Sequence, residues 1–186
     1  MKSINHKQLA QYLKDQFLSF SSGFSKKAFA FGCIEPDLNP FSYLKGSFRN
    51  RMLRGHNFGS SRRLLERLSG RLQRTNRWNA LNCYRLGKLT HYVSDAFTAA
   101  HNEFFTGSLR EHRSYEFSLG SVFPSYLRAP ADDGAPQRGG LWPELLSLHD
   151  RYCEQPRGVN TDASFILRAS EAVMNALLPR PAAQGA

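Results

Sequence analysis

The chain has 186 residues, of which 41% are hydrophobic and 12% aromatic, so it can form one domain with a sizeable core and is not a disordered protein. Its formal net charge of +10 favours an anionic partner, and the lack of any run of about 18 apolar residues argues against a membrane span. The three cysteines are dispersed without a CxxC pair, which argues against a disulfide framework or a thiolate zinc site. We expect them to be buried or half-buried.

The N-terminal segment, MKSINHKQLAQYLKDQF, mixes charges with apolar residues and has no continuous apolar stretch of a signal peptide, so we expect a cytoplasmic protein. Its apolar spacing predicts a helix from Asn5 to about Phe20, with Gly23 as the stop. In CIEPDLNPF, two prolines within five residues disfavour a regular helix, so we expect residues 35–39 to form a fixed loop that holds Asp37. The Gly-bounded turn RGHNFGSS holds His56.

A basic segment follows, with nine arginines from Arg49 to Arg77 against a single acid, Glu66. Its second half predicts a helix capped by Ser60 or Ser61. The segment is consistent with a surface for anionic lipid, nucleic acid or a phosphoester substrate, and equally with a solvated helix face.

The longest periodic segment runs from about Trp78 to Ala100 and carries one apolar stripe, made of Leu86, Leu89, Val93 and Phe97. His91 and Asp95 fall on a different face beside small residues, which indicates a helix central to a bundle. A further helix from about Ser108 to Leu127 places His112 and Glu116 at the margin of its own apolar stripe, which contains Tyr115, Leu119, Val122 and Tyr126.

The rest of the chain completes an all-α prediction. Residues 128–141 form a Pro/Gly-rich loop, and two shorter helices are expected near Pro143–Tyr152 and Asp162–Leu178. We therefore predict one all-α domain over residues 1–179, a bundle of about six to eight helices, with residues 180–186 as a disordered tail.

The histidines and acids between residues 91 and 116 form the strongest chemical signal. His91 and Asp95, and likewise His112 and Glu116, stand four residues apart, with His101 between the two pairs. A lone pair of this kind is usually a surface ion pair, but two pairs on inward faces favour a metal, because side chains at i and i+4 lie one above the other.

Imidazole and carboxylate without thiolate suit zinc, with manganese or iron as alternatives. Five ligands exceed what one tetrahedral zinc needs, so we expect two ions and further ligands from elsewhere in the chain. Asp37 and His56 are the natural candidates, and His6 is a further one.

These motifs resemble the zinc-dependent phospholipases C of bacteria, a family related to the single-strand-specific fungal zinc nucleases. The resemblance rests on LGKLTHYVSD, on His101 six residues after Asp95, on HRSYE, on INHKQL and on the EPD and RGHNF regions, and it covers about residues 4–117.

The resemblance implies a first zinc held by Asp37, His56, His91 and Asp95, and a second held by His101, His112 and Glu116. It also implies a third zinc held by Asp95, His6 and the N-terminal amine. Because only five residues precede His6 and no signal peptide is seen, we expect the amine not to reach the site, and hence two zinc ions.

The predicted function is phospholipase C-like hydrolysis of a phosphodiester by metal-activated water, with Asp37 as ligand and general base. The predicted partner is an anionic phosphoester substrate, such as phospholipid at a membrane surface; the head group and the oligomeric state stay open.

Two alternatives remain. One is a zinc nuclease acting on single-stranded nucleic acid, favoured by the basic segment, with Trp78 or Phe58 as a stacking platform. The other is a non-catalytic, zinc-stabilised helical binding protein. The pair His149-Asp150 is expected to lie on the surface of a late helix.

Overall fold

The computed structural model describes residues 1–19, 21–39, 58–128 and 140–179. This part of the chain contains seven α-helices, one short 3-10 turn and no strand, which confirms the all-α prediction. The helices are α1 (Ser3–Phe17), α2 (Gly23–Leu38), α4 (Phe58–Gln73), α5 (Ala80–Ala96), α6 (Leu109–Tyr126), α7 (Leu141–Glu154) and α8 (Val159–Leu177), and the 3-10 turn is η2 (Ala99–His101).

Three of these helices begin at capping side chains, which accept a hydrogen bond from an otherwise unsatisfied backbone N–H of the first turn. Ser22 caps α2 and Asn79 caps α5. Ser108 caps α6 and forms a capping box, because the Glu111 carboxylate in turn accepts from the Ser108 N–H at 2.7 Å. The capping residue thus lies directly before α6 and fixes Leu109 as the first residue of the helix.

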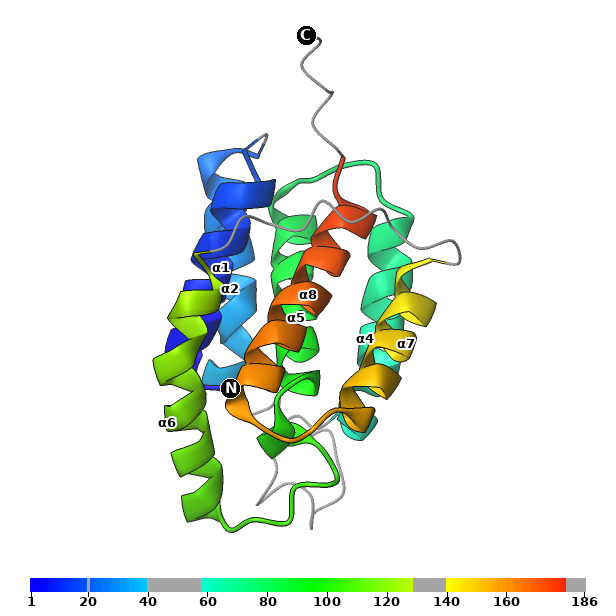
Figure 1. Ribbon diagram of the computed structural model, residues 1–186. Coiled ribbons are helices and arrows are strands. Elements are labelled where there is room, and N and C mark those ends of the chain that lie inside the picture. The colour runs from blue at the N-terminus through cyan, green and yellow to red at the C-terminus, as the bar shows by residue number, and fades with distance from the viewer. Residues whose placement is uncertain (20, 40–57, 129–139, 180–186) are drawn as a thin grey trace, which may run out of the picture.

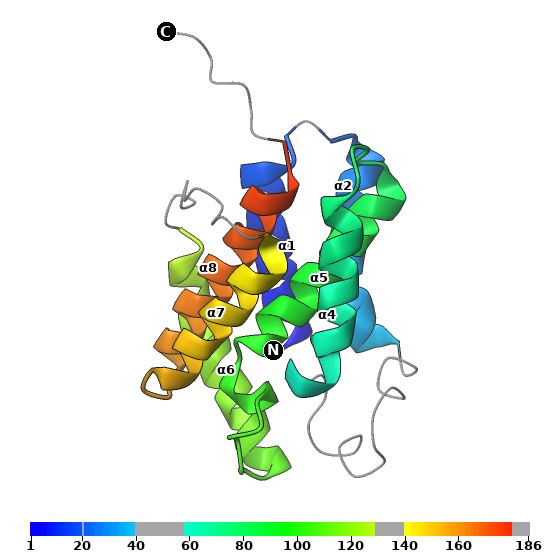
Figure 2. The ribbon, with the colours of Figure 1, turned by 90° about the vertical axis from the view of Figure 1, so that its right-hand side faces the viewer.

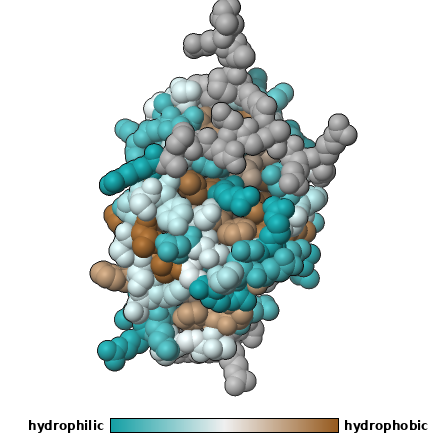
Figure 3. Space-filling model, in the orientation of Figure 1, coloured by the Kyte–Doolittle hydropathy of each residue, from teal (hydrophilic) through white to brown (hydrophobic). Residues whose placement is uncertain are grey.

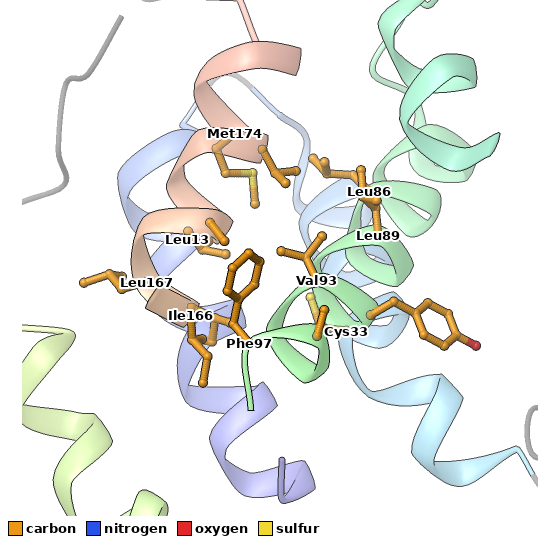
Figure 4. Packing of buried hydrophobic residues seen from close by; sticks show 14 of the residues in the cluster. Leu13, Cys33, Leu86, Leu89, Val93, Phe97, Ile166, Leu167 and Met174 are labelled. Atoms are coloured by element: carbon orange, nitrogen blue, oxygen red, sulfur yellow. The ribbon is translucent and has the colours of Figure 1, made fainter. Parts of the chain in front are cut away.

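Helix α5 lies at the centre of the bundle and packs against α2, α4 and α8 (Figure 1). Seen from the side, α4 lies beside α5, and α7 lies beside α8 (Figure 2). The predicted stripe of α5 is fully buried, with Leu86, Leu89, Val93 and Phe97 each no more than 1% exposed. In Figure 4, these side chains face Leu13 of α1 and Ile166 and Met174 of α8, which belong to the same apolar core.

Helices α2 and α5 approach each other at two glycines. A Cβ placed on Gly32 would lie 2.2 Å from the Tyr84 carbonyl oxygen, and one on Gly87 would lie 2.1 Å from the Phe29 carbonyl oxygen. Both obstacles are backbone atoms, so only glycine allows this spacing. The close approach brings the end of α2, with Asp37, beside the half of α5 that carries His91.

The structure corrects three local predictions. Residues 35–38 are not a loop but the last turn of α2, with Pro36 inside the helix. The helix continues past the proline because the Asn39 N–H donates to the Glu35 carbonyl at 2.9 Å and the Asn39 amide donates to the Glu35 carboxylate at 2.7 Å. Gly23 begins α2 rather than ending α1, and α4 starts at Phe58, before the serines predicted to cap it.

Apolar and hydrophilic side chains alternate over the face shown in Figure 3. Helix α4 and the turn after it expose a stripe of six arginines, Arg62, Arg63, Arg67, Arg71, Arg74 and Arg77. Within the described residues, none of these six arginines forms an ion pair with a carboxylate. The Lys88–Glu35 pair at 2.9 Å is the one ion pair that a lysine or arginine side chain makes in this part of the chain.

None of the described helices combines the length and the apolar character needed to cross a membrane.

Candidate metal centre

A first group of candidate ligands joins α1 to α5. His6 of α1 and His91 and Asp95 of α5 bring one ligand atom each to within 4.8 Å of one another, and all three side chains are buried. The Asp95 carboxylate lies 3.3 Å from His6 Nε2 and 3.4 Å from His91 Nε2. The two imidazole rings stack at 4.0 Å between centroids, so both Nε2 atoms face the same carboxylate.

A second group joins η2 to α6. It consists of His101, His112 and Glu116, again with ligand atoms within 4.8 Å of one another. His101 Nε2 lies 3.1 Å and His112 Nε2 3.5 Å from the same Glu116 carboxylate oxygen. His101 is buried, whereas His112 and Glu116 are half-buried, so this group lies closer to solvent than the first.

Asp95 connects the two groups. Its second oxygen lies 3.8 Å from His101 Nδ1, so a single carboxylate faces histidines of both groups. In the fold, the ligands come from the start of α1, the end of α5, η2 and the first half of α6, which meet in the lower half of the molecule in Figure 1. The structure therefore brings together five residues that the sequence analysis singled out between residues 91 and 116.

The amino group of Met1 lies among these ligands, and the prediction that it would not reach the site is wrong. The ammonium donates to Asp95 at 2.8 Å and lies 2.7 Å from His101 Nε2 and 3.1 Å from the Glu116 carboxylate. The reason is that α1 begins at Ser3, which leaves only two residues between the helix and the amine. Since the helix places His6 in the site, it also places its own N-terminus there.

Asp37 lies at the rim of the first group. One of its oxygens is 3.7 Å from His91 Nε2 and the other is 4.0 Å from His6 Nε2. The latter oxygen also accepts a hydrogen bond from the Ser3 hydroxyl at 2.7 Å. With its side chain 17% exposed, Asp37 is the candidate carboxylate most open to solvent.

Neighbouring groups orient the two buried imidazoles. His91 Nδ1 lies 2.9 Å from the Cys33 carbonyl oxygen, which can only accept, so Nδ1 carries the proton. Ser94 gives its single proton to the His91 carbonyl, so His6 Nδ1, at 3.2 Å, must donate to the Ser94 hydroxyl. In the neutral form both rings therefore turn an Nε2 lone pair toward the carboxylates, as metal-ligating histidines do.

The pKa values of these groups reflect burial and the charges of their neighbours. Burial lowers the pKa of His6 to about 4, and nearby His91 adds to the effect, so His6 is neutral at pH 7. Burial acts to raise the pKa of Asp95, but the Met1 ammonium and three histidines outweigh it and hold that pKa well below its usual value. For Glu116, hydrogen bonds with His101 and His112 lower the pKa against burial.

A neutral imidazole nitrogen facing a carboxylate oxygen is one acceptor facing another. Among the described residues, the acceptors His6 Nε2 and Asp95 Oδ2 are buried without a hydrogen-bond partner. Buried acceptors of this kind are costly unless a cation lies between them. The donor set thus fits zinc, which takes imidazole nitrogen and carboxylate oxygen.

Other predicted residues have different outcomes. His56 lies outside the described residues, as do most of the loop at 128–141 and the tail. His149 is not on the surface but 7% exposed, because its ring stacks on Phe58 at 3.7 Å and its Nε2 lies 3.1 Å from the Asn102 amide oxygen. The same stack covers one face of the Phe58 ring. The cysteines are free, two buried and one half-buried, as expected.

Sequence reasoning missed the position of the amine and a buried carboxylate, Asp162, which contacts η2 and α6. The acid stands in the first turn of α8, where acids are common, so its spacing gave no signal.

Comparison with protein families gives a match to the model of zinc-dependent phospholipase C over residues 5–169. The matched region includes every candidate ligand named above except the Met1 amine. Searches of curated proteins and of solved structures give no match. With most of its length matched, the chain belongs to the zinc-dependent phospholipase C family.

Proposed function

We propose that this protein is a phosphodiester hydrolase that acts on a phospholipid-type substrate with two zinc ions. One zinc would be held by Asp37, His91 and Asp95, with His56 completing the four ligands and His6 beside them. The other zinc would be held by His101, His112 and Glu116. The observation that carries the proposal is the Asp95 carboxylate, which faces His6, His91 and His101 at 3.3 to 3.8 Å and so joins both groups.

Zinc bound at the two groups would supply the charge neutralisation and the acidified water, with a pKa of about 7, that phosphodiester hydrolysis requires. The protein's own residues then have distinct tasks. Asp95 and the buried histidines His6, His91 and His101 hold position, because burial and mutual contacts fix their side chains. Asp37 accepts the proton from the attacking water, because it is the candidate carboxylate most open to solvent and the Ser3 hydroxyl fixes its orientation.

The exposed arginine stripe of α4 supports an anionic substrate or surface. Six exposed cations on α4 and the turn after it attract phosphate groups and raise their local concentration, with an effect that weakens as salt is added. The same stripe favours the second candidate function, a zinc nuclease. Lipid vesicles and single-stranded nucleic acid, compared as substrates at equal phosphate concentration, decide between the two.

The test of the metal function begins with zinc content. We expect the purified protein to hold about two zinc ions per chain and to lose hydrolysis of a chromogenic phosphodiester when a chelator removes them. Activity should return with added zinc. A content of three ions would assign the third to Asp95, His6 and the Met1 amine, whereas protein that neither holds nor takes up zinc refutes the proposal.

A further inference from the structure

The buried carboxylate of Asp162, at the start of α8, lies outside the metal centre. It is 1% exposed and accepts three hydrogen bonds, from the Ala99 N–H at 2.7 Å, the Tyr115 hydroxyl at 2.9 Å and the Tyr152 hydroxyl at 2.8 Å. None of these three hydrogen bonds involves a candidate metal ligand. Its three donors come from η2, α6 and α7, so one side chain joins three elements to α8.

The first of these bonds fixes η2. Ala99 is the first residue of this short turn and His101 is its last, and the His101 N–H is bonded to the Thr98 carbonyl at 2.9 Å. A three-residue turn has few hydrogen bonds of its own, so its position depends on contacts outside it. Because the Ala99 N–H cannot rotate, the carboxylate sets where the backbone of η2 lies.

The second bond fixes α6. Tyr115 stands one residue before Glu116 and three residues after His112, so its hydroxyl ties down the turn of α6 that carries both ligands. The Ala99 and Tyr115 bonds end on the same carboxylate oxygen, Oδ2. That single atom therefore sets the distance between the two elements that supply the second group.

We propose that Asp162 is a positioning residue for the second zinc, through its shared bonds to η2 and α6. The inference rests on the proposed zinc function but concerns one of its two sites. The third bond provides the contrast, because Tyr152 lies on α7, which supplies none of the candidate ligands among the described residues. Loss of the Tyr115 bond should therefore loosen the second group, and loss of the Tyr152 bond should not.

The experiment compares Tyr115→Phe with its matched control Tyr152→Phe, in full-length protein loaded with Co²⁺ in place of zinc. Cobalt absorption bands report the ligand geometry, and competition with a chelator gives the affinity of each site. We expect Tyr115→Phe to lower the affinity for one of the two Co²⁺ ions by about tenfold and to change the absorption band of that ion. Tenfold is the lower end of the affinity loss expected when a residue that supports a metal ligand is replaced. Tyr152→Phe should leave the Co²⁺ affinities of both sites within about twofold of those of the parent protein.

Asp162→Asn and Asp162→Ala complete the test. The asparagine keeps an amide oxygen that can accept from Ala99 and Tyr115, while its NH₂ can donate to the Tyr152 hydroxyl, so it should retain the second ion; alanine should lose it. Equal loss in Tyr115→Phe and Tyr152→Phe, or an unchanged second site in a folded Asp162→Ala, would overturn the inference. Parent protein that binds no metal would instead refute the proposed function.

Discussion

The close packing of α2 on α5 can be tested by Gly87→Ala. The new methyl group would lie 2.1 Å from the Phe29 carbonyl oxygen and 2.9 Å from the Cys33 nitrogen. Ordinary contact needs about 3.4 Å, so the helices must separate by roughly 1 Å. Such a shift would stretch the 2.9 Å bond between His91 Nδ1 and the Cys33 carbonyl to about 4 Å, beyond hydrogen-bonding range.

The expected cost combines two opposing effects. Overpacking destabilises a core by about 1–3 kcal/mol, and replacement of glycine by alanine within a helix returns up to about 1 kcal/mol. Because the obstacles here are backbone atoms that cannot rotate away, we expect a net loss of about 1–2 kcal/mol in the free energy of unfolding. The loss of the Cys33 bond should also weaken the first zinc site.

Gly70→Ala in α4 is the matched control, since its new methyl group would have only the flexible Arg74 side chain near it, at 3.6 Å. We expect this variant to be unchanged or up to about 1 kcal/mol more stable. Urea denaturation of the metal-free proteins measures both values, and chelator competition measures the zinc affinity. If Gly87→Ala proves as stable as Gly70→Ala, the close approach of α2 and α5 is not the constraint that we describe.

Three further predictions concern the site and its surroundings. Asp37→Asn should lower kcat by about 10²- to 10⁴-fold even when added zinc restores full occupancy, because the amide oxygen can still bind zinc but cannot accept a proton; full activity at restored occupancy would make Asp37 a ligand only. His91→Ala should stay helical by circular dichroism and lose one zinc and the activity, whereas unfolding would favour the non-catalytic, zinc-stabilised alternative. Burial lowers the pKa of His149 to about 4, so below pH 6.5 the unfolded chain binds a proton that the native state refuses, and stability falls as the pH falls. We expect the parent protein to lose roughly 2 kcal/mol between pH 7 and pH 5 relative to His149→Gln, and parallel curves for the two proteins would contradict a buried, neutral His149.

The sequence by itself determined the helical class and the ligands that lie close together along the chain. Apolar spacing identified α5 and its buried stripe, because a helix repeats its faces every 3.6 residues. The i,i+4 pairs His91–Asp95 and His112–Glu116 were predictable for the same reason. In these cases the geometry depends on residues within one helix, so their spacing along the chain is enough to predict it.

Only the tertiary structure decided what joins these local pairs. Two glycines allow α2 to lie against α5, and this contact places Asp37 at the rim of the first group, in a helix that its prolines seemed to exclude. The packing of α1 brings His6 to Asp95, together with the Met1 amine from 94 residues away along the chain. Helix propensity and spacing describe neighbours along one helix, whereas these distances depend on how whole helices pack, which no local pattern encodes.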